Sequence, residues 1–268
     1  MKKLITLTSI GLVIWACSTN PLTGRKSLAL VSNTELFPQA FSQYDQVLDE
    51  SQVDKTSANA KMITNVGQRI KAAAEKYYAE KGHSQALKGY EWEFSLIKND
   101  QLNAWCMPGG KVAFYTGILP ICKDETGVAV VMGHEVFHAL AGHSAEQVSN
   151  SMVAQGLMLG GNAVISNDQW RGVFNDLYPV GAQLGMLKYG RNMELDADEG
   201  GLYLMAMAGY NPKEAAPFWE RMSQASSGGQ APPEFMSTHP NPGNRIAQIN
   251  AIMDKAMAFY NASPYKGK

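Results

Sequence analysis

The strongest constraint on the fold is a run of apolar residues that leads directly into three polar ones. The apolar segment Val128–Met132 precedes His134, Glu135 and His138. This continuous apolar pattern predicts a buried helix that covers residues 125–147. Two imidazoles and a carboxylate are costly to bury unless each has a partner. The sequence therefore predicts a polar site inside the core.

The spacing of these three residues is typical of a zinc site. Positions i and i+4 lie one above the other on a helix, so His134 and His138 can hold one Zn²⁺. Glu135 is offset by about 100° around the helix, where it can hold and deprotonate a water beside the metal. The alternative is a pair of core histidines bonded to the backbone or to each other. The motif favours a hydrolase with one zinc ion per chain.

An acidic cluster further along the chain offers the third protein ligand that a catalytic zinc needs. Glu194 and Asp198 are four residues apart and share one helical face. Glu194 can bind the metal, and Asp198 can accept the N–H of a ligating histidine. Glu146 is the alternative ligand, although it lies about 12 Å further along the helix axis. His143, five residues beyond His138, is predicted to be a structural or interhelical histidine.

Short strands precede the motif helix, and helices dominate the rest of the chain. Residues 90–97 alternate apolar and polar side chains, and residues 102–107 and 111–116 flank the turn Pro108-Gly109-Gly110. These segments predict a small antiparallel sheet beside the active-site helix. The expected fold class is α+β, mostly helical and zincin-like. The expected helices cover residues 34–49, 57–80, 125–147, 149–165, 170–189, 191–208, 212–225 and 242–260.

The first residues differ in character from the rest of the chain. A short basic start and an apolar stretch predict a secretory signal peptide over residues 1–16. Ala16 followed by Cys17 resembles a bacterial lipoprotein cleavage site, at which the cysteine is acylated and anchors the chain to a membrane. A plain signal peptide or an uncleaved anchor is the alternative. Ser18 after the cysteine favours the periplasmic side of the outer membrane.

Export would place two further cysteines in an oxidising compartment. Cys106 and Cys122 are predicted to pair, with two buried thiols as the alternative. Residues 17–33 are rich in turn signals and are expected to form a lipid-anchored tether. Residues 34–268 are expected to form one zinc metallopeptidase domain. The net charge of −1 and the lack of a basic stripe argue against nucleic acid as a partner.

Several motifs in a fixed order resemble one known family. They are Asn103, Pro108-Gly109-Gly110-Lys111, Tyr115-Thr116-Gly117, His134-Glu135-Val136-Phe137-His138, Glu194-Leu195-Asp196-Ala197-Asp198, Ser237-Thr238-His239-Pro240 and Arg245. In this order they resemble the gluzincin metallopeptidases related to HtpX, the Oma-type proteases and the CAAX prenyl proteases. The chain is most similar to their bacterial periplasmic lipoprotein branch, which is LoiP-like. The resemblance extends from about Thr34 to Met253.

The resemblance implies a role for each matching residue. The zinc ligands would be His134, His138 and Glu194. Glu135 would be the general base, and Asp198 would support the ligands from behind. His239 would approach the oxyanion of the reaction, and Arg245 would support it.

The resemblance also implies how a substrate binds. The edge of the sheet would accept an extended polypeptide, because an edge strand has unpaired backbone N–H and C=O groups. The residues expected at this edge are Lys111, Val112, Ala113, Phe114 and Tyr115.

These observations predict a zinc-dependent endopeptidase that hydrolyses unfolded or extended envelope polypeptides as part of protein quality control. The competing interpretation is a non-catalytic or latent zinc-binding lipoprotein that acts as a chaperone or assembly factor. In that case His239 would be the fourth ligand that closes the metal site. A zinc hydrolase of another amide substrate is a third alternative.

Overall fold

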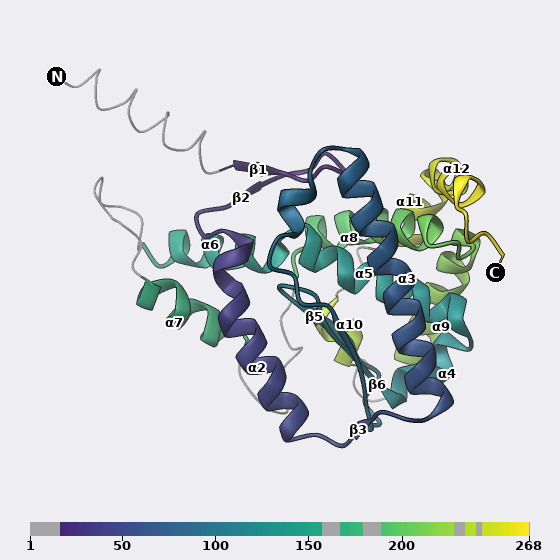
Figure 1. Cartoon of the computed structure of the whole chain (residues 1–268), viewed down its shortest axis with the longest axis horizontal. Helices are drawn as coiled ribbons and strands as arrows, with labels where there is room; N and C mark the ends of the chain where they lie inside the picture. The colour runs from purple at the N-terminus through teal and green to yellow at the C-terminus, as the bar shows by residue number, and fades with distance from the viewer. Residues whose placement is uncertain (1–16, 157–166, 179–188, 228–233, 240–242, 268) are drawn as a thin grey trace.

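Helices surround a small sheet in the computed structural model, which describes residues 17–156, 167–178, 189–227, 234–239 and 243–267 (Figure 1). The predicted fold class, mostly helical α+β, is confirmed. The α-helices are α2 (Phe37–Asp49), α3 (Ala58–Glu80), α4 (Leu119–Cys122), α5 (Glu125–Leu140), α6 (His143–Ala154), α7 (Asn167–Leu177), α8 (Arg191–Met207), α9 (Ala215–Ser227), α10 (Glu234–Thr238), α11 (Arg245–Ala251) and α12 (Met253–Ala262). The 3-10 turns are η1 (Asn33–Leu36), η2 (Ser84–Leu87), η3 (Thr116–Ile118) and η4 (Pro212–Glu214). The strands are β1 (Cys17–Thr19), β2 (Lys26–Leu28), β3 (Val53–Asp54), β4 (Glu93–Ile97), β5 (Ala104–Met107) and β6 (Lys111–Tyr115).

The predicted signal peptide and parts of two expected helices, 149–165 and 170–189, lie outside the described residues. Within the part of the chain that the structure describes, no helix combines the length and the apolar character needed to cross a membrane.

The main sheet is mixed rather than antiparallel throughout. Its strand order is β3-β4-β6-β5, with β4 parallel to β6 and β5 antiparallel to β6. Gly109 and Gly110 close the β5–β6 hairpin with φ angles of 87° and 88°, in the left-handed region that glycine adopts readily. The predicted hairpin is therefore present, and the parallel pair is the difference from the expected sheet.

The strand order corrects the prediction of the substrate edge. Strand β6, the stretch Lys111–Tyr115, pairs with β4 on one side and with β5 on the other. Its backbone groups are already used by two neighbours, so it is not an edge strand, and the prediction is wrong on this point. Among the described strands of this sheet, β5 is the edge next to β6.

Both faces of the sheet are covered, which explains why β5 and β6 are buried along their whole length. Leu96, Val112 and Phe114 point into a core shared with α3, α5 and α8. Ala113 and Tyr115, their neighbours along β6, point into a second core that includes side chains of α2, α6 and α7. Figure 1 shows the strands between α2 and α3. Alternate residues of one strand therefore serve two cores.

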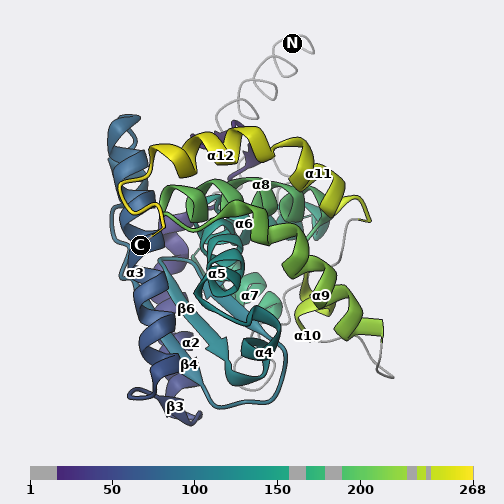
Figure 2. The same cartoon turned by 90° about the vertical axis from the view of Figure 1, so that its right-hand side faces the viewer.

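Helices α5 and α8 cross at a contact between backbones. A Cβ atom on Gly133 would lie 2.6 Å from the carbonyl oxygen of Gly201, and one on Gly201 would lie 2.7 Å from the amide nitrogen of His134. A Cβ atom on Gly200 would lie 2.1 Å from the ring of Phe137. Figure 2 shows α8 lying across α5, with α12 on its other side. Only glycine allows this approach, which brings both helices to the predicted site.

Replacing Gly201 with alanine is expected to lower the free energy of unfolding by about 1–3 kcal/mol, since the new methyl group forces the helices apart. Gly172 in α7 is the matched control, because a Cβ there meets nothing within 4 Å. Gly172→Ala should be neutral or stabilise by up to about 1 kcal/mol through helix propensity. Urea unfolding of both variants measures the difference, and equal effects would contradict the packing argument.

The segment 17–33 differs from the expected tether, because it is folded against the domain. Strands β1 and β2 form an antiparallel hairpin. Leu22 is 5% exposed and belongs to the core around α5, and Val31 is 1% exposed in the second core. The backbone amides of Leu30 and Val31 donate to the hydroxyl of Ser149 on α6, at 3.0 and 3.3 Å. This segment is therefore part of the folded unit.

The predicted disulfide is absent from the structure. Cys106 and Cys122 are both free thiols and both are buried. Cys106 lies on β5, where its thiol is 3.5 Å from the carbonyl oxygen of Met107, and Cys122 ends α4. Sequence spacing and redox compartment do not specify whether two Cβ atoms meet. Burial raises the pKa of each thiol, which keeps both protonated at neutral pH.

Candidate metal centre and active site

Helix α5 positions the motif residues in the interior. Asp124 caps its first turn by accepting from the amides of Thr126 and Gly127, at 2.8 and 3.1 Å. The helix ends at Leu140 rather than at residue 147, because Gly142 adopts a φ angle of 68° and a new helix begins after it. His134, Glu135 and His138 are each at most 2% exposed.

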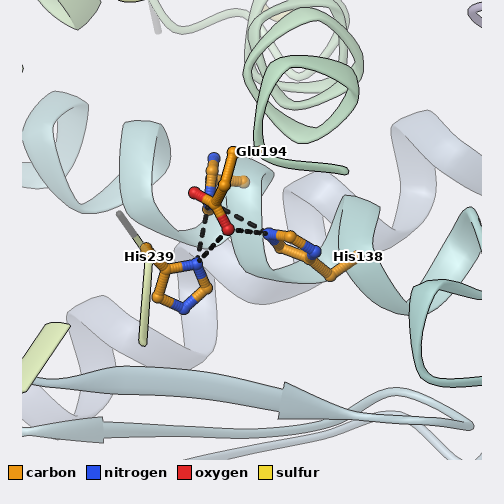
Figure 3. A group of neighbouring side chains, drawn as sticks. His138, Glu194 and His239 are labelled. Carbon is orange, nitrogen blue, oxygen red and sulfur yellow. Dashed lines mark hydrogen bonds and ion pairs between the residues drawn. The ribbon is translucent and has the colours of Figure 1, made fainter. Parts of the chain in front are cut away.

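The structure brings the three predicted ligands together. Nε2 of His134 and Nε2 of His138 lie 3.1 Å apart. Glu194 lies on α8, and its Oε2 is 3.5 Å from Nε2 of His134 while its Oε1 is 3.5 Å from Nε2 of His138. Figure 3 shows its carboxylate between the imidazoles of His138 and His239. Glu146, the alternative ligand, instead forms two contacts of 2.7 Å with Arg25.

His239, at the end of α10, joins the same group. Its Nδ1 lies 3.0 Å from Glu194 Oε1 and 3.3 Å from His134 Nε2. Its Nε2 lies 3.4 Å from Glu135 Oε1. One donor atom from each of His134, His138, Glu194 and His239 lies within 4.8 Å of the others. His239 thus contacts the ligand group with one ring nitrogen and the predicted base with the other.

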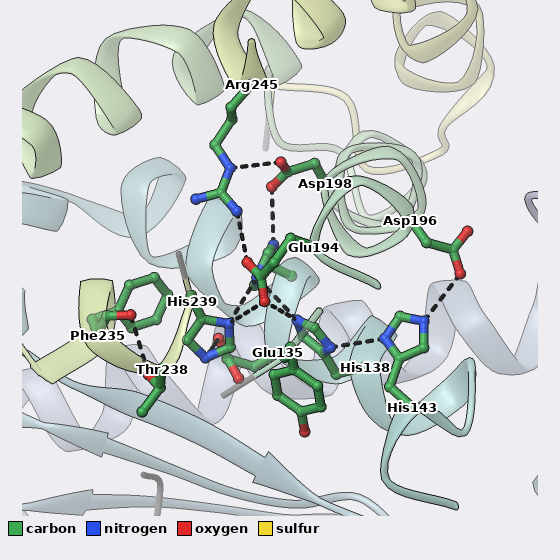
Figure 4. A network of polar contacts seen from close by, with 12 residues as sticks. Glu135, His138, His143, Glu194, Asp196, Asp198, Phe235, Thr238, His239 and Arg245 are labelled. Carbon is green, nitrogen blue, oxygen red and sulfur yellow. Dashed lines mark hydrogen bonds and ion pairs between the residues drawn. The ribbon is translucent and has the colours of Figure 1, made fainter. Parts of the chain in front are cut away.

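A buried ion-pair network supports the ligands from behind (Figure 4). Asp198 Oδ1 lies 3.1 Å from Nδ1 of His134, as expected of a partner that orients a ligating histidine. Arg245 reaches Asp198 at 2.6 Å and Glu194 at 2.7 Å, and its guanidinium stacks 3.8 Å from the centre of the Trp219 ring. Arg245 thus compensates the negative charges of two buried carboxylates and holds both side chains in place.

Burial and neighbouring charges shift the pKa values of the site residues in different directions. Burial opposes a charged His134, but hydrogen bonds to Asp198 and Glu194 outweigh it and raise its pKa. Burial, followed by the nearby His134, lowers the pKa of His138 well below its usual value. Burial opposes ionisation of Glu194, yet His239 and His134 bring its pKa well below the normal range. Burial raises the pKa of Glu135 to about 8.

The donor set fits a divalent metal such as zinc. Two Nε2 atoms face each other, and an anionic carboxylate points between them. A cation there would satisfy all three, and imidazole nitrogen with carboxylate oxygen is a donor set that zinc accepts. Among the described residues, Glu135 Oε1 is a buried oxygen without a hydrogen-bond partner. A buried polar atom without a partner is found where an ion, a water molecule or another ligand completes a site.

Sequence reasoning missed several residues that contact the site. Tyr189 stacks on His138, with ring centres 3.9 Å apart and planes 22° apart. The hydroxyl of Tyr178 bonds to that of Ser144 and lies 3.5 Å from that of Tyr189. No spacing rule marks an aromatic residue in a loop as a neighbour of a distant histidine. His143 does bridge helices, as predicted, since it contacts His138 at 2.8 Å.

The fold and the site together have the arrangement of a gluzincin-type metallopeptidase. Two histidines one helical turn apart and a glutamate from a second helix converge beside a small sheet, with a carboxylate next to the first histidine. The sequence profile of peptidase family M48 matches residues 65–253. The chain belongs to peptidase family M48.

The relatives that the chain resembles carry the names of metalloendopeptidases or proteases. The chain is 34% identical to the mitochondrial metalloendopeptidase OMA1 of Saccharomyces cerevisiae, over 75% of this chain and 58% of the relative. It is 31% identical to the protein of the same name from Arabidopsis thaliana, over 87% of this chain and 43% of the relative. It is 26% identical to the beta-barrel assembly-enhancing protease of Escherichia coli, over 62% of this chain and 35% of the relative. The chain thus spans about half the length, or less, of these relatives.

Proposed function

We propose that this chain is a zinc-dependent endopeptidase with one zinc ion, held by His134, His138 and Glu194. The observation that carries the proposal is the convergence of these side chains from α5 and α8, with contacts of 3.1 and 3.5 Å. Glu135 lies beside this group and makes none of those contacts. A carboxylate in that position is free to act on a water molecule.

The residues around the site suggest how the reaction proceeds. Zinc, when bound, supplies Lewis acidity that activates water and polarises a carbonyl group. Glu135 takes the proton from the water and passes it to the leaving amine. His239, whose Nε2 lies 3.4 Å from Glu135, donates to the oxyanion that forms on the substrate. Arg245 holds Glu194 and Asp198 during these steps.

The substrate class follows from the neighbouring strand. Strand β5 packs against α5, the helix that carries the proposed base Glu135. Strand β5 is the sheet edge next to β6. An extended polypeptide can add to such an edge through backbone hydrogen bonds, which accept any sequence. Unfolded or extended envelope proteins are therefore the proposed substrates, in protein quality control.

The proposed location is the bacterial periplasm, with the chain anchored to the outer membrane through a lipid on Cys17. The support is the lipoprotein-like cleavage pattern before Cys17 and the similarity to a bacterial protease named for beta-barrel assembly. Mass spectrometry of the mature N-terminus checks this location. An unmodified Cys17 or a retained Met1 would contradict it.

Removing the metal is expected to lower casein hydrolysis by about a hundredfold or more, because the water loses its Lewis acid. The measurement uses the purified chain treated with a zinc chelator and then supplied with one equivalent of zinc. Restored activity at one zinc per chain, counted by plasma mass spectrometry, would support the proposal. Hydrolysis that continues at the starting rate in the metal-free chain would contradict it.

The position of His239 favours one second candidate, a latent or non-catalytic zinc protein. Its Nδ1 lies 3.0 Å from Glu194 and 3.3 Å from His134, so it can complete a closed set of four donors. A zinc-loaded chain that leaves casein intact, and cleaves it once His239 is replaced by alanine, would favour this candidate. The endopeptidase mechanism expects the opposite, since His239→Ala removes an oxyanion donor worth about a hundredfold in rate.

A further inference from the structure

A line of buried polar contacts leads away from His138 on the side opposite the proposed metal. Nδ1 of His138 lies 2.8 Å from Nδ1 of His143, the first residue of α6. Nε2 of His143 lies 3.1 Å from Oδ2 of Asp196 on α8. Figure 4 shows His143 between these two partners. The two histidines are fully buried and Asp196 is 6% exposed.

The line ends at Arg25 in the N-terminal hairpin. The guanidinium of Arg25 makes two contacts of 2.7 Å with the Glu146 carboxylate and lies 3.9 Å from Oδ2 of Asp196. The carbonyl of Arg25 accepts from the amide of Asn20 at 2.9 Å, which closes the hairpin turn. The Asn20 side chain accepts from the amide of Leu22, a core residue, at 2.8 Å. The turn that presents Arg25 is thus fixed from both sides.

These contacts specify which nitrogen of His138 carries a hydrogen. A carboxylate only accepts, so Nε2 of His143 must donate to Asp196. In the neutral ring, Nδ1 of His143 is then an acceptor, and Nδ1 of His138 must donate to it. The remaining nitrogen of His138, Nε2, keeps its lone pair and faces His134 and Glu194. That is the tautomer a metal ligand needs.

We propose that Arg25, Asp196 and His143 are positioning residues that fix the tautomer and orientation of His138. Arg25 compensates the negative charges of Glu146 and Asp196, which α6 and α8 place on either side of it. The N-terminal hairpin thereby belongs to the metal centre, although it lies more than a hundred residues from it in sequence. This inference rests on the zinc site of the proposed function.

The test compares two arginines that make similar ion pairs. Arg221 pairs with Glu214 at 2.7 Å and has an exposed side-chain fraction of 17%, against 21% for Arg25. Zinc affinity is measured by competition with a chelator, and the coordination geometry by the visible spectrum of the cobalt-substituted protein. Arg25→Ala is expected to weaken zinc binding about tenfold and to change the cobalt spectrum. Arg221→Ala should leave both within twofold of the unaltered chain.

Two further variants separate positioning from a general loss of structure. Asp196→Ala should weaken zinc binding at least as much as Arg25→Ala, because it removes the acceptor of His143 directly. Arg25→Lys should give an intermediate zinc affinity. Lysine keeps the charge but lacks the two guanidinium N–H groups that bind both oxygens of Glu146. Thermal melting of each metal-free variant reports folding, and Arg25→Lys serves as the test if Arg25→Ala does not fold.

The outcomes distinguish this inference from the proposed function. Should the unaltered chain bind no zinc, the proposed function fails and the inference fails with it. Should the unaltered chain bind zinc while folded Arg25 and Asp196 variants keep its affinity and its cobalt spectrum, only the positioning role is overturned. The positioning role is supported if zinc affinity falls from Arg25→Lys to Asp196→Ala while Arg221→Ala keeps the affinity of the unaltered chain.

Discussion

Glu135→Gln is expected to lower kcat/KM for peptide hydrolysis about a thousandfold while leaving the zinc content at the level of the unaltered chain. Glutamine has nearly the same shape and can stay in the same buried place, but it cannot take a proton from water. Zinc stays because Glu135 makes none of the contacts that join the ligand group. A fluorogenic peptide gives the rate, and plasma mass spectrometry gives the metal content.

The control for this variant is Glu199→Gln. Glu199 is also on a ligand-bearing helix, but its carboxylate bonds to the hydroxyl of Tyr203 at 2.9 Å and takes no part in the site. This change should leave both rate and metal content nearly unaltered. If zinc-loaded Glu135→Gln hydrolyses peptides at the rate of the unaltered chain, Glu135 is not the base.

Glu194→Ala is expected to weaken zinc binding by more than about a hundredfold, beyond the range seen when only an outer partner is lost. The carboxylate lies 3.5 Å from the Nε2 atoms of both His134 and His138, and no other described carboxylate joins this group of metal donors. Hydrolysis should fall with the metal content. Equilibrium competition with a chelator measures the affinity.

Loss of Glu194 also removes a partner of Arg245, which is 1% exposed and still contacts Asp198 at 2.6 Å. Breaking a buried ion pair costs about 3–5 kcal/mol, so the alanine variant would be less stable as well. Glu194→Gln keeps an oxygen that can accept from Arg245 and separates the two effects. Full zinc retention in both variants would remove Glu194 from the ligand set.

Local sequence patterns were enough to predict the half of the site that stands on α5. His134 and His138 are one turn apart, and helix geometry alone places them on one face. The apolar run before them indicated that the helix is buried, which the structure confirms for Val128–Met132. Asp198 was placed behind the ligands from its spacing to Glu194, and it does lie 3.1 Å from His134.

The order of the strands in the sheet and the contacts between distant residues could not be predicted in the same way. The hairpin turn places β5 beside β6. Nothing in the spacing of the strands specifies which of these two pairs with β4. The sequence pattern does not predict the helix break at Gly142, because a single glycine is tolerated inside a helical pattern. The number of cysteines and an oxidising compartment predict that Cys106 and Cys122 pair, but neither specifies whether the two sulfur atoms meet. Arg25 carries no local signal, since its partners lie on two helices far along the chain.

The backbone contact between α5 and α8 has a thermodynamic consequence. His134 and His138 stand on one helix and Glu194 on the other, so their donor atoms converge only while that contact is intact. A cation bound there interacts with the native chain and finds no preformed site once the helices separate. Its binding then adds to the free energy of unfolding, by about 2.7 kcal/mol at a hundredfold excess over Kd. The concentration of free metal in the surrounding compartment would therefore set part of the stability of the folded chain.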